Sequence, residues 1–138
     1  MNASRLPLFA CAPLCALALS ACAATVSTSS FSGVKHDVAQ TISNLQADAT
    51  AGEYKKLCSV DLAAAAVSRL GGAKGCEAAL KTQLGEVDSF EVSVQSIQLG
   101  AGETTATAHV KSVQQGKSKP STVLLVKQAG KWKVSSLG

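Results

Sequence analysis

The five cysteines are the residues of this chain with the clearest potential for chemistry, and three of them lie near the N-terminus. Cys22 follows two small residues, at the end of an almost wholly apolar run over residues 6–19. A cysteine thiolate can be alkylated where a serine hydroxyl cannot. Small residues before it let an extended chain enter a peptidase active site. This setting predicts covalent modification of Cys22 together with cleavage of the chain.

The first 21 residues have the composition of a secretory signal peptide. One positive charge, Arg5, precedes the apolar run, which contains Pro7 and Pro13. A membrane-spanning helix needs about 20 apolar residues, whereas the apolar region of a signal peptide needs only about 7–15. We therefore expect residues 1–21 to direct export and to be removed.

The residues Leu19-Ser20-Ala21-Cys22 resemble the lipobox of bacterial lipoproteins, in which an aliphatic residue and two small residues precede an obligatory cysteine. The resemblance implies a diacylglyceryl group on the Cys22 sulfur, cleavage before Cys22 and, in many species, acylation of the new amino group. Two or three acyl chains, at about 0.8 kcal/mol per buried CH₂, give permanent anchoring. The resemblance also implies that the protein lies in the bacterial cell envelope, outside the cytoplasm. The alternative is an ordinary secretory signal cleaved after Ala21 or Ala23.

Cys58 and Cys76 then remain as one pair in an exported compartment that permits disulfides. Seventeen residues lie between them, and closing such a loop contributes about 3 kcal/mol on the chain-entropy model. The alternatives are two buried free thiols or metal ligands. The sequence has no C-x-x-C motif, and His36 and His109 have no partner at ligand spacing. We expect a disulfide and no metal site.

Residues suited to acid–base catalysis are few. The only histidines are His36 and His109, and the only tyrosine is Tyr54. No nucleophile motif or glycine-rich phosphate loop accompanies them. His36 is expected at the surface, and His109 on the solvent face of a strand. Tyr54 and His109 are nevertheless the two candidates for lining a pocket.

The 138 residues, 46% hydrophobic and 16% charged, predict one domain with a modest core and exclude a multidomain enzyme. Basic charge concentrates in the second half of the chain, where five lysines surround two predicted turns. These are Lys117, Lys119, Lys127, Lys131 and Lys133. They suit anionic lipid headgroups or cell-wall polymers, or equally a solvated edge that discourages aggregation. One tryptophan and no arginine after Arg69 argue against a nucleic-acid partner.

Residues 22–33, rich in serine and threonine, predict a flexible tether before a domain over residues 34–138. Apolar residues at spacings of three and four then predict an amphipathic helix, formed around Val34, Val38, Ile42, Leu45 and Ala49. Shorter helices are expected over residues 53–58, 61–70 and 76–84, with Asp61 as the N-cap of the second of these. A Cys58–Cys76 bond would then join two helix ends.

Alternating apolar residues predict strands over residues 90–99, 104–114, 122–127 and 131–137. The first strand shifts phase between Val94 and Ile97, which predicts a bulge. Trp132 and Val134 are expected on one core face, with the flanking lysines toward water. The unbroken apolar run over residues 123–126 predicts a strand covered on both faces.

Helices followed by antiparallel strands predict an α+β fold, with the helices packed on one face of a curved sheet. Three motifs support a closer match: GEYKKLC at 52–58, GCEAAL at 75–80 and LVKQAGKWKV at 125–134. On these motifs, residues 34–138 resemble the nuclear-transport-factor-2-like superfamily, in particular its small exported bacterial members. The resemblance implies a cone of helices and sheet, closed by a hairpin whose tryptophan packs beneath the sheet.

Three functions are compatible with these features, because a fold does not by itself define an activity. We expect a lipid-anchored envelope protein with a noncatalytic binding domain, no cofactor beyond its own lipid, and an envelope protein or small molecule as partner. The alternatives are a small isomerase- or dehydratase-like enzyme, and an assembly or stability factor that acts through protein contacts. An enclosed polar pocket containing Tyr54 or His109 favours the enzyme, and a pocket filled by leucine and valine favours the assembly factor.

Overall fold

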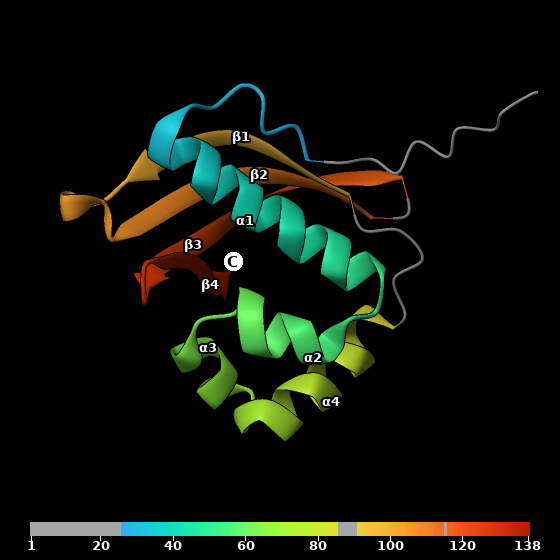
Figure 1. Ribbon diagram of the computed structural model, residues 1–138. Coiled ribbons are helices and arrows are strands. Elements are labelled where there is room, and N and C mark those ends of the chain that lie inside the picture. The colour runs from blue at the N-terminus through green and yellow to red at the C-terminus, as the bar shows by residue number, and fades with distance from the viewer. Residues whose placement is uncertain (1–25, 86–90, 115) are drawn as a thin grey trace, which may run out of the picture.

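A computed structural model describes residues 26–85, 91–114 and 116–138. The predicted signal peptide, Cys22 and Phe90 lie outside the described residues. Helices precede strands, in the order α1 (Gly33–Thr50), α2 (Tyr54–Lys56), η1 (Leu57–Asp61), α3 (Ala64–Arg69), α4 (Gly72–Leu84), β1 (Glu91–Leu99), η2 (Ala101–Glu103), β2 (Thr105–Gln114), β3 (Lys117–Gln128) and β4 (Lys131–Leu137). The predicted α+β class is confirmed (Figure 1).

Helix α1 packs on the sheet through the apolar stripe that the sequence predicts. Val38, Ile42 and Leu45 are buried, and Val34 and Ala49 pack against the same core at the two ends of the stripe. The helix contacts both edge strands, β1 and β4. The regular spacing of these apolar residues therefore buries one face of α1 along its whole length.

The four strands form one antiparallel sheet in the order β1-β2-β3-β4. The predicted bulge is confirmed, because the pairing of β1 with β2 shifts between Val94 and Ser96. This extra residue lets Val92 and Ile97, which differ in phase, both point into the core. In β2, Ala106, Ala108 and Val110 are buried as their alternation predicts.

Strand β3 is longer than the sequence predicts, because it begins at Lys117 rather than at Thr122. Its first residues pair with β2, and Pro120 lies opposite Lys111. Strand β4 reaches only as far as Val123 along β3. At Pro120, β3 therefore has no neighbouring strand on the side away from β2. The N–H that proline lacks is not needed there for pairing between strands.

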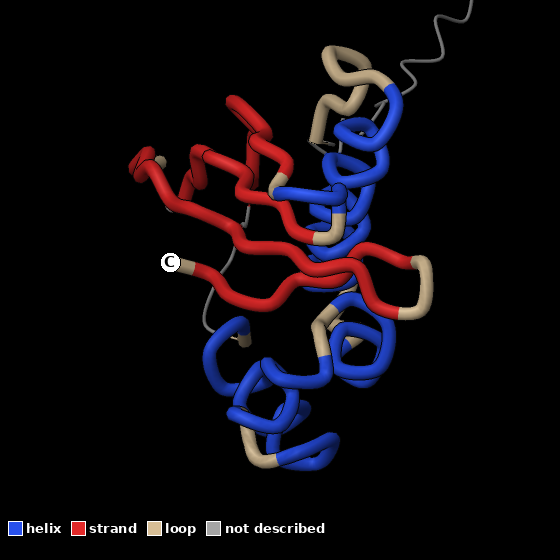
Figure 2. Tube along the Cα trace, turned by 90° about the vertical axis from the view of Figure 1, so that its left-hand side faces the viewer, coloured by secondary structure: helices blue, strands red, loops and turns tan. Residues whose placement is uncertain are grey.

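The sheet is covered by helices on one face only (Figure 2). Val123 and Leu125 are buried, but Leu124 between them is 42% exposed. The expectation that this strand is covered on both faces was therefore wrong. The run of four apolar residues has the alternating burial of a one-sided sheet.

The short helices differ from their predicted boundaries. Asp61 ends the π-helical turn η1 and does not cap α3. The chain extends after it, so that Leu62 bridges Val134 and the Ala63 N–H donates to the Val134 carbonyl at 2.8 Å. Helix α3 starts only then, and the Gln128 side chain accepts from its first amide, that of Ala64, at 3.2 Å.

The described part of the predicted tether is packed onto the domain. Val26 is 5% exposed and belongs to the hydrophobic core, and Phe31 packs against that core. The Phe31 N–H donates to the Thr28 carbonyl at 3.1 Å, which closes a turn between them. Residues 26–32, which we call the strap, therefore form part of the folded domain.

The five lysines predicted around two turns lie toward the two ends of β3. Lys117 and Lys119 lie at the start of β3, whereas Lys127 and Lys131 lie beside the turn at its other end. Lys133 does not point freely to water, because its Nζ donates to the Val60 carbonyl at 2.8 Å. The strand between the two groups separates them, so they do not form one basic patch.

Trp132 is a core residue, as its alternation with Lys131 predicts. Its side chain is 7% exposed and shares the inner face with Val134, which is fully buried. The Nε1 atom is buried without a hydrogen-bond partner among the described residues. The ring therefore stabilises the domain by apolar burial, with Lys127 Nζ 5.8 Å from its centroid.

We expect Trp132→Ala to lower the free energy of unfolding by about 3–5 kcal/mol, because it leaves a cavity in the core. Trp132→Phe should cost less, since it keeps most of the apolar surface and removes the unpaired N–H. Lys131→Ala is the matched control and should change stability by less than about 0.5 kcal/mol. Urea unfolding followed by circular dichroism measures all three, and equal effects of Trp132→Ala and Lys131→Ala would contradict a core role.

Candidate functional site

An open groove of about 490 Å³ lies between α2 and α4. One wall comes from the turn after α1 and from α2, with Tyr54 as its aromatic residue. The other wall is the outer face of α4. The complete lining is Gly52, Glu53, Tyr54, Lys55, Lys74, Glu77, Ala78 and Lys81. The groove thus combines one aromatic ring with charges of both signs.

A glycine turn places the Tyr54 ring in this wall. Gly52 follows α1 with φ of +72°, a left-handed conformation that favours glycine. The Tyr54 N–H donates to the Gly52 carbonyl at 2.9 Å. A Cβ at Gly52 would lie 3.9 Å from the ring, which is ordinary contact. The backbone conformation, and not lack of space, is therefore what calls for glycine here.

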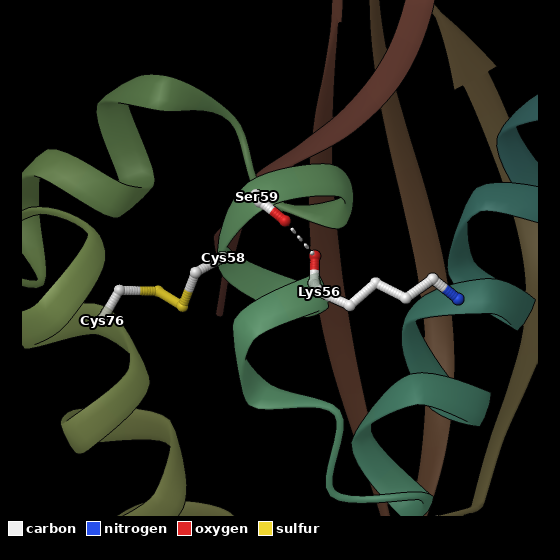
Figure 3. Close-up of a disulfide and its surroundings, with 4 residues drawn as sticks. All are labelled: Lys56, Cys58, Ser59 and Cys76. Atoms are coloured by element: carbon white, nitrogen blue, oxygen red, sulfur yellow. Dashed lines mark hydrogen bonds between the residues drawn. A yellow bond between two sulfur atoms is a disulfide. The ribbon is translucent and has the colours of Figure 1, made fainter.

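The opposite wall depends on the Cys58–Cys76 disulfide, which joins η1 to α4 with the two Cα atoms 6.1 Å apart (Figure 3). Cys76 lies inside α4, so the bond does not join two helix ends as the sequence suggested. In α4, which the structure describes in full, Cys76 is the one buried residue. The disulfide therefore adds a covalent attachment to the packing of Leu80 and Leu84, which are partly buried against the core.

Two buried carboxyl groups lie where η1 packs on α1. Asp48 is 7% exposed and Asp61 is 4% exposed. Lys56 Nζ donates to Asp48 Oδ1 at 2.7 Å, and its side chain runs away from the disulfide toward α1 (Figure 3). The Oδ2 atom of each carboxyl has no donor among the described N–H and O–H groups. A proton held by Asp61 and donated to Asp48 satisfies both groups.

The surroundings favour this protonated state. Burial raises the pKa of Asp61 to about 7, and the hydrogen bond and negative charge of Asp48 act in the same direction. The positive charges of Lys56 and Lys133 oppose them. The hydrogen bond from Lys56 to Asp48 raises the pKa of Lys56. Below about pH 7 the Asp61 carboxyl is therefore protonated and carries no charge.

The sequence analysis did not predict this acid pair, although the position of Asp48 indicated that its carboxyl is buried. Asp48 follows Leu45 by three residues and so lies on the apolar face of the predicted helix. A carboxyl group there implies a buried partner. Asp61 carried no such signal, because its burial arises from the extended link at Leu62 that ties η1 to β4.

A second, smaller hollow lies inside the helical layer, between α1, η1, α4 and the end of β4. Its volume is about 80 Å³, and its walls are almost wholly apolar. The lining residues are Leu45, Ala49, Leu57, Leu62, Leu80, Gln83, Leu84 and Leu137. Neither Tyr54 nor His109 contributes to it. It is a gap between leucine side chains with one amide at its border.

The structure does not bring the two pocket candidates together. His109 is exposed on the open face of the sheet, opposite Thr122, whereas Tyr54 lies in the groove among the helices. His36 lies at the start of α1, 3.9 Å from Asp37. Over the described ranges, no three histidine, cysteine or acidic side chains are grouped as a metal site would require.

The described helices include none with the length and apolarity needed to cross a bilayer. The chain matches no family model, no curated protein and no solved structure.

We expect the loss of the disulfide, by Cys58→Ser with Cys76→Ser, to lower the free energy of unfolding by about 2–4 kcal/mol. The loop it closes holds α3 and the first part of α4 to η1, and the unfolded chain gains entropy without it. Denaturant unfolding of the variant and of the oxidised protein measures the difference. Free-thiol labelling of both cysteines in the non-reduced protein would show that the bond is absent.

The acid pair predicts a pH-dependent stability. Because the folded state raises the pKa of Asp61 from 3.8 to about 7, the folded state binds a proton that the unfolded state releases. The resulting stabilisation is complete below the unfolded pKa and is lost as the pH rises through about 7. Asp61→Asn keeps a donor for Asp48 and removes this titration.

Unfolding free energies measured between about pH 4 and about pH 9 should fall with pH more steeply in the wild type than in Asp61→Asn. Asp37→Asn, at an exposed carboxyl, is the control and should keep the wild-type slope. Parallel curves for wild type and Asp61→Asn would show that Asp61 does not titrate near neutrality.

Proposed function

We propose that this protein is a lipid-anchored protein of the bacterial cell envelope that acts through noncatalytic contacts with another envelope protein. The observation that carries the proposal is the lipobox Leu19-Ser20-Ala21-Cys22, followed at Val26 by the packed part of a disulfide-bonded domain. A lipid on Cys22 anchors the domain, and export permits the Cys58–Cys76 bond. The fold we propose is a nuclear-transport-factor-2-like cone.

Buried Trp132 in the closing hairpin supports that fold. In the family that the sequence resembles, the final tryptophan packs beneath the sheet. The helices cover a single face of the sheet in this chain as well. Together with the order of elements, these features support the cone.

The shape of the interior supports protein contacts over catalysis. Pockets that enclose a small-molecule substrate commonly have volumes of about 300–1,000 Å³ and a few converging polar groups. The apolar hollow among the helices here has only about 80 Å³ and is lined mainly by leucine. A leucine-filled interior is what we expect of an assembly or stability factor.

The groove beside Tyr54 is the contact surface that we assign to this function. Tyrosine gives a large, rigid contact area and is enriched at the energetic centres of protein interfaces. Lysines and glutamates surround it on both walls, which suits a partner segment that carries both charges. Its open form accepts a protein segment more readily than it encloses a small molecule.

We expect Cys22→Ser to abolish lipid attachment, because a hydroxyl cannot replace the thiolate in thioether formation. The variant should remain unprocessed or be released from the membrane. Intact mass of the membrane-extracted protein, with fractionation of cells, measures both effects. Unchanged membrane retention and mass in the variant would contradict lipidation at Cys22.

The contact surface can be tested with a photo-crosslinking amino acid placed in the living cell at position 54 or position 109. Crosslinks from the groove at Tyr54, and none from His109 on the open sheet face, are the expected result. Crosslinks from His109 alone would assign the contact to the sheet. A small molecule that co-purifies in stoichiometric amount and is lost on Tyr54→Ala would favour the ligand-binding alternative.

A further inference from the structure

The strap, residues 26–32, is fixed to the domain at two points. Val26 is buried in the core, and Phe31 packs against it from the far end of the turn. Between them Ser27, Ser29 and Ser30 are exposed. The strap therefore has an apolar inner side and an outer side that carries hydroxyl groups.

The packed strap limits the distance between the domain and a lipid on Cys22. Three residues separate Cys22 from Val26, and an extended chain spans at most about 3.6 Å per residue. The Cα atoms of these two residues are therefore at most about 14 Å apart, whatever path the chain takes. A free chain up to Gly33 would permit about 40 Å.

The strap and the groove lie at opposite ends of the molecule. The strap and the first turn of α1 are at the top of Figures 1 and 2, and α4 is at the bottom of both. The two views share their vertical axis, so they agree on this separation. A short attachment at the strap therefore keeps that end next to the anchor and α4 away from it.

We propose that the packed strap orients the protein on the membrane, with its hydroxyl-rich outer side against the lipid headgroups and the groove facing away. This inference rests on the proposed lipid attachment at Cys22. The exposed charges at the start of α1, Lys35 and Asp37, balance one another. The orientation follows from tether length and does not require anionic lipid.

The orientation determines the side from which a partner can reach the groove. A partner bound there approaches from the side away from the bilayer. Release of Val26 and Phe31 would lengthen the tether and remove the fixed orientation. The strap thus couples the position of the anchor to the direction in which the domain presents its contact surface.

The test uses the full lipidated chain in phosphatidylcholine vesicles that contain a headgroup-spin-labelled lipid. A fluorophore is attached to Ser30→Cys in the strap or, as the matched control, to Lys74→Cys on α4. Both positions are exposed, and intact mass verifies that the Cys58–Cys76 bond remains. A third variant carries an inserted Gly/Ser linker of about 12 residues after Thr25, with a reach of about 20 Å.

The expected result is strong quenching at position 30, little at position 74, and loss of this difference in the linker variant. Equal quenching at both positions on vesicle-bound protein, or a difference that the linker leaves unchanged, overturns the orientation and leaves lipid attachment standing. Protein that fails to float with the vesicles contradicts lipid attachment itself, and with it the orientation.

Discussion

The Cys58–Cys76 disulfide is the constraint on which the helical half of this protein depends. Helix α4 packs on α3, α2 and η1, and the cysteine is its single buried residue along its fully described length. Its other apolar contacts come from side chains that are only partly buried, among them Leu80 and Leu84, so apolar burial stabilises this helix less than it stabilises α1. The covalent bond adds to this attachment, and it places Lys74, Glu77 and Lys81 opposite Tyr54. The bond joins residues 18 apart in the chain, in the two segments beside the groove.

A polar contact joins η1 to α1, the helix that packs on the sheet. Asp48 and Asp61 meet in a buried pair, and Lys56 neutralises the negative charge that remains when one proton is shared. Burying two carboxyl groups is unfavourable unless they are protonated or paired. The proton therefore stabilises the contact between α1 and η1. The sheet end carries the strap and the helix end carries the groove, so this contact lies between the proposed anchor and the proposed contact surface.

The sequence predicted well those elements whose pattern is local. The stripe of α1, the alternation in β2 and the phase shift in β1 each repeat over several turns or residues. Features that depend on distant parts of the chain were not predictable. Pro120 lies between the strands predicted over residues 104–114 and 122–127, and only the short reach of β4 shows why a strand tolerates it. Asp61 resembled a helix cap, yet the bridge from Leu62 to Val134 turns its carboxyl inward. In the groove, the sequence identified Tyr54 as a pocket candidate. Its charged neighbours on α4 were not predicted, because they lie near Tyr54 only in the folded chain, where α4 is bonded to η1.

The dependence of α4 on the disulfide is tested most directly by amide hydrogen exchange, which measures local opening free energies. The oxidised protein is compared with protein reduced under native conditions, and exchange is followed in α4 and in the central strands β2 and β3. We expect reduction to accelerate exchange strongly across Gly72–Leu84 while β2 and β3 remain protected. Unchanged protection of α4 after reduction, or equal acceleration in helix and strands, would contradict it.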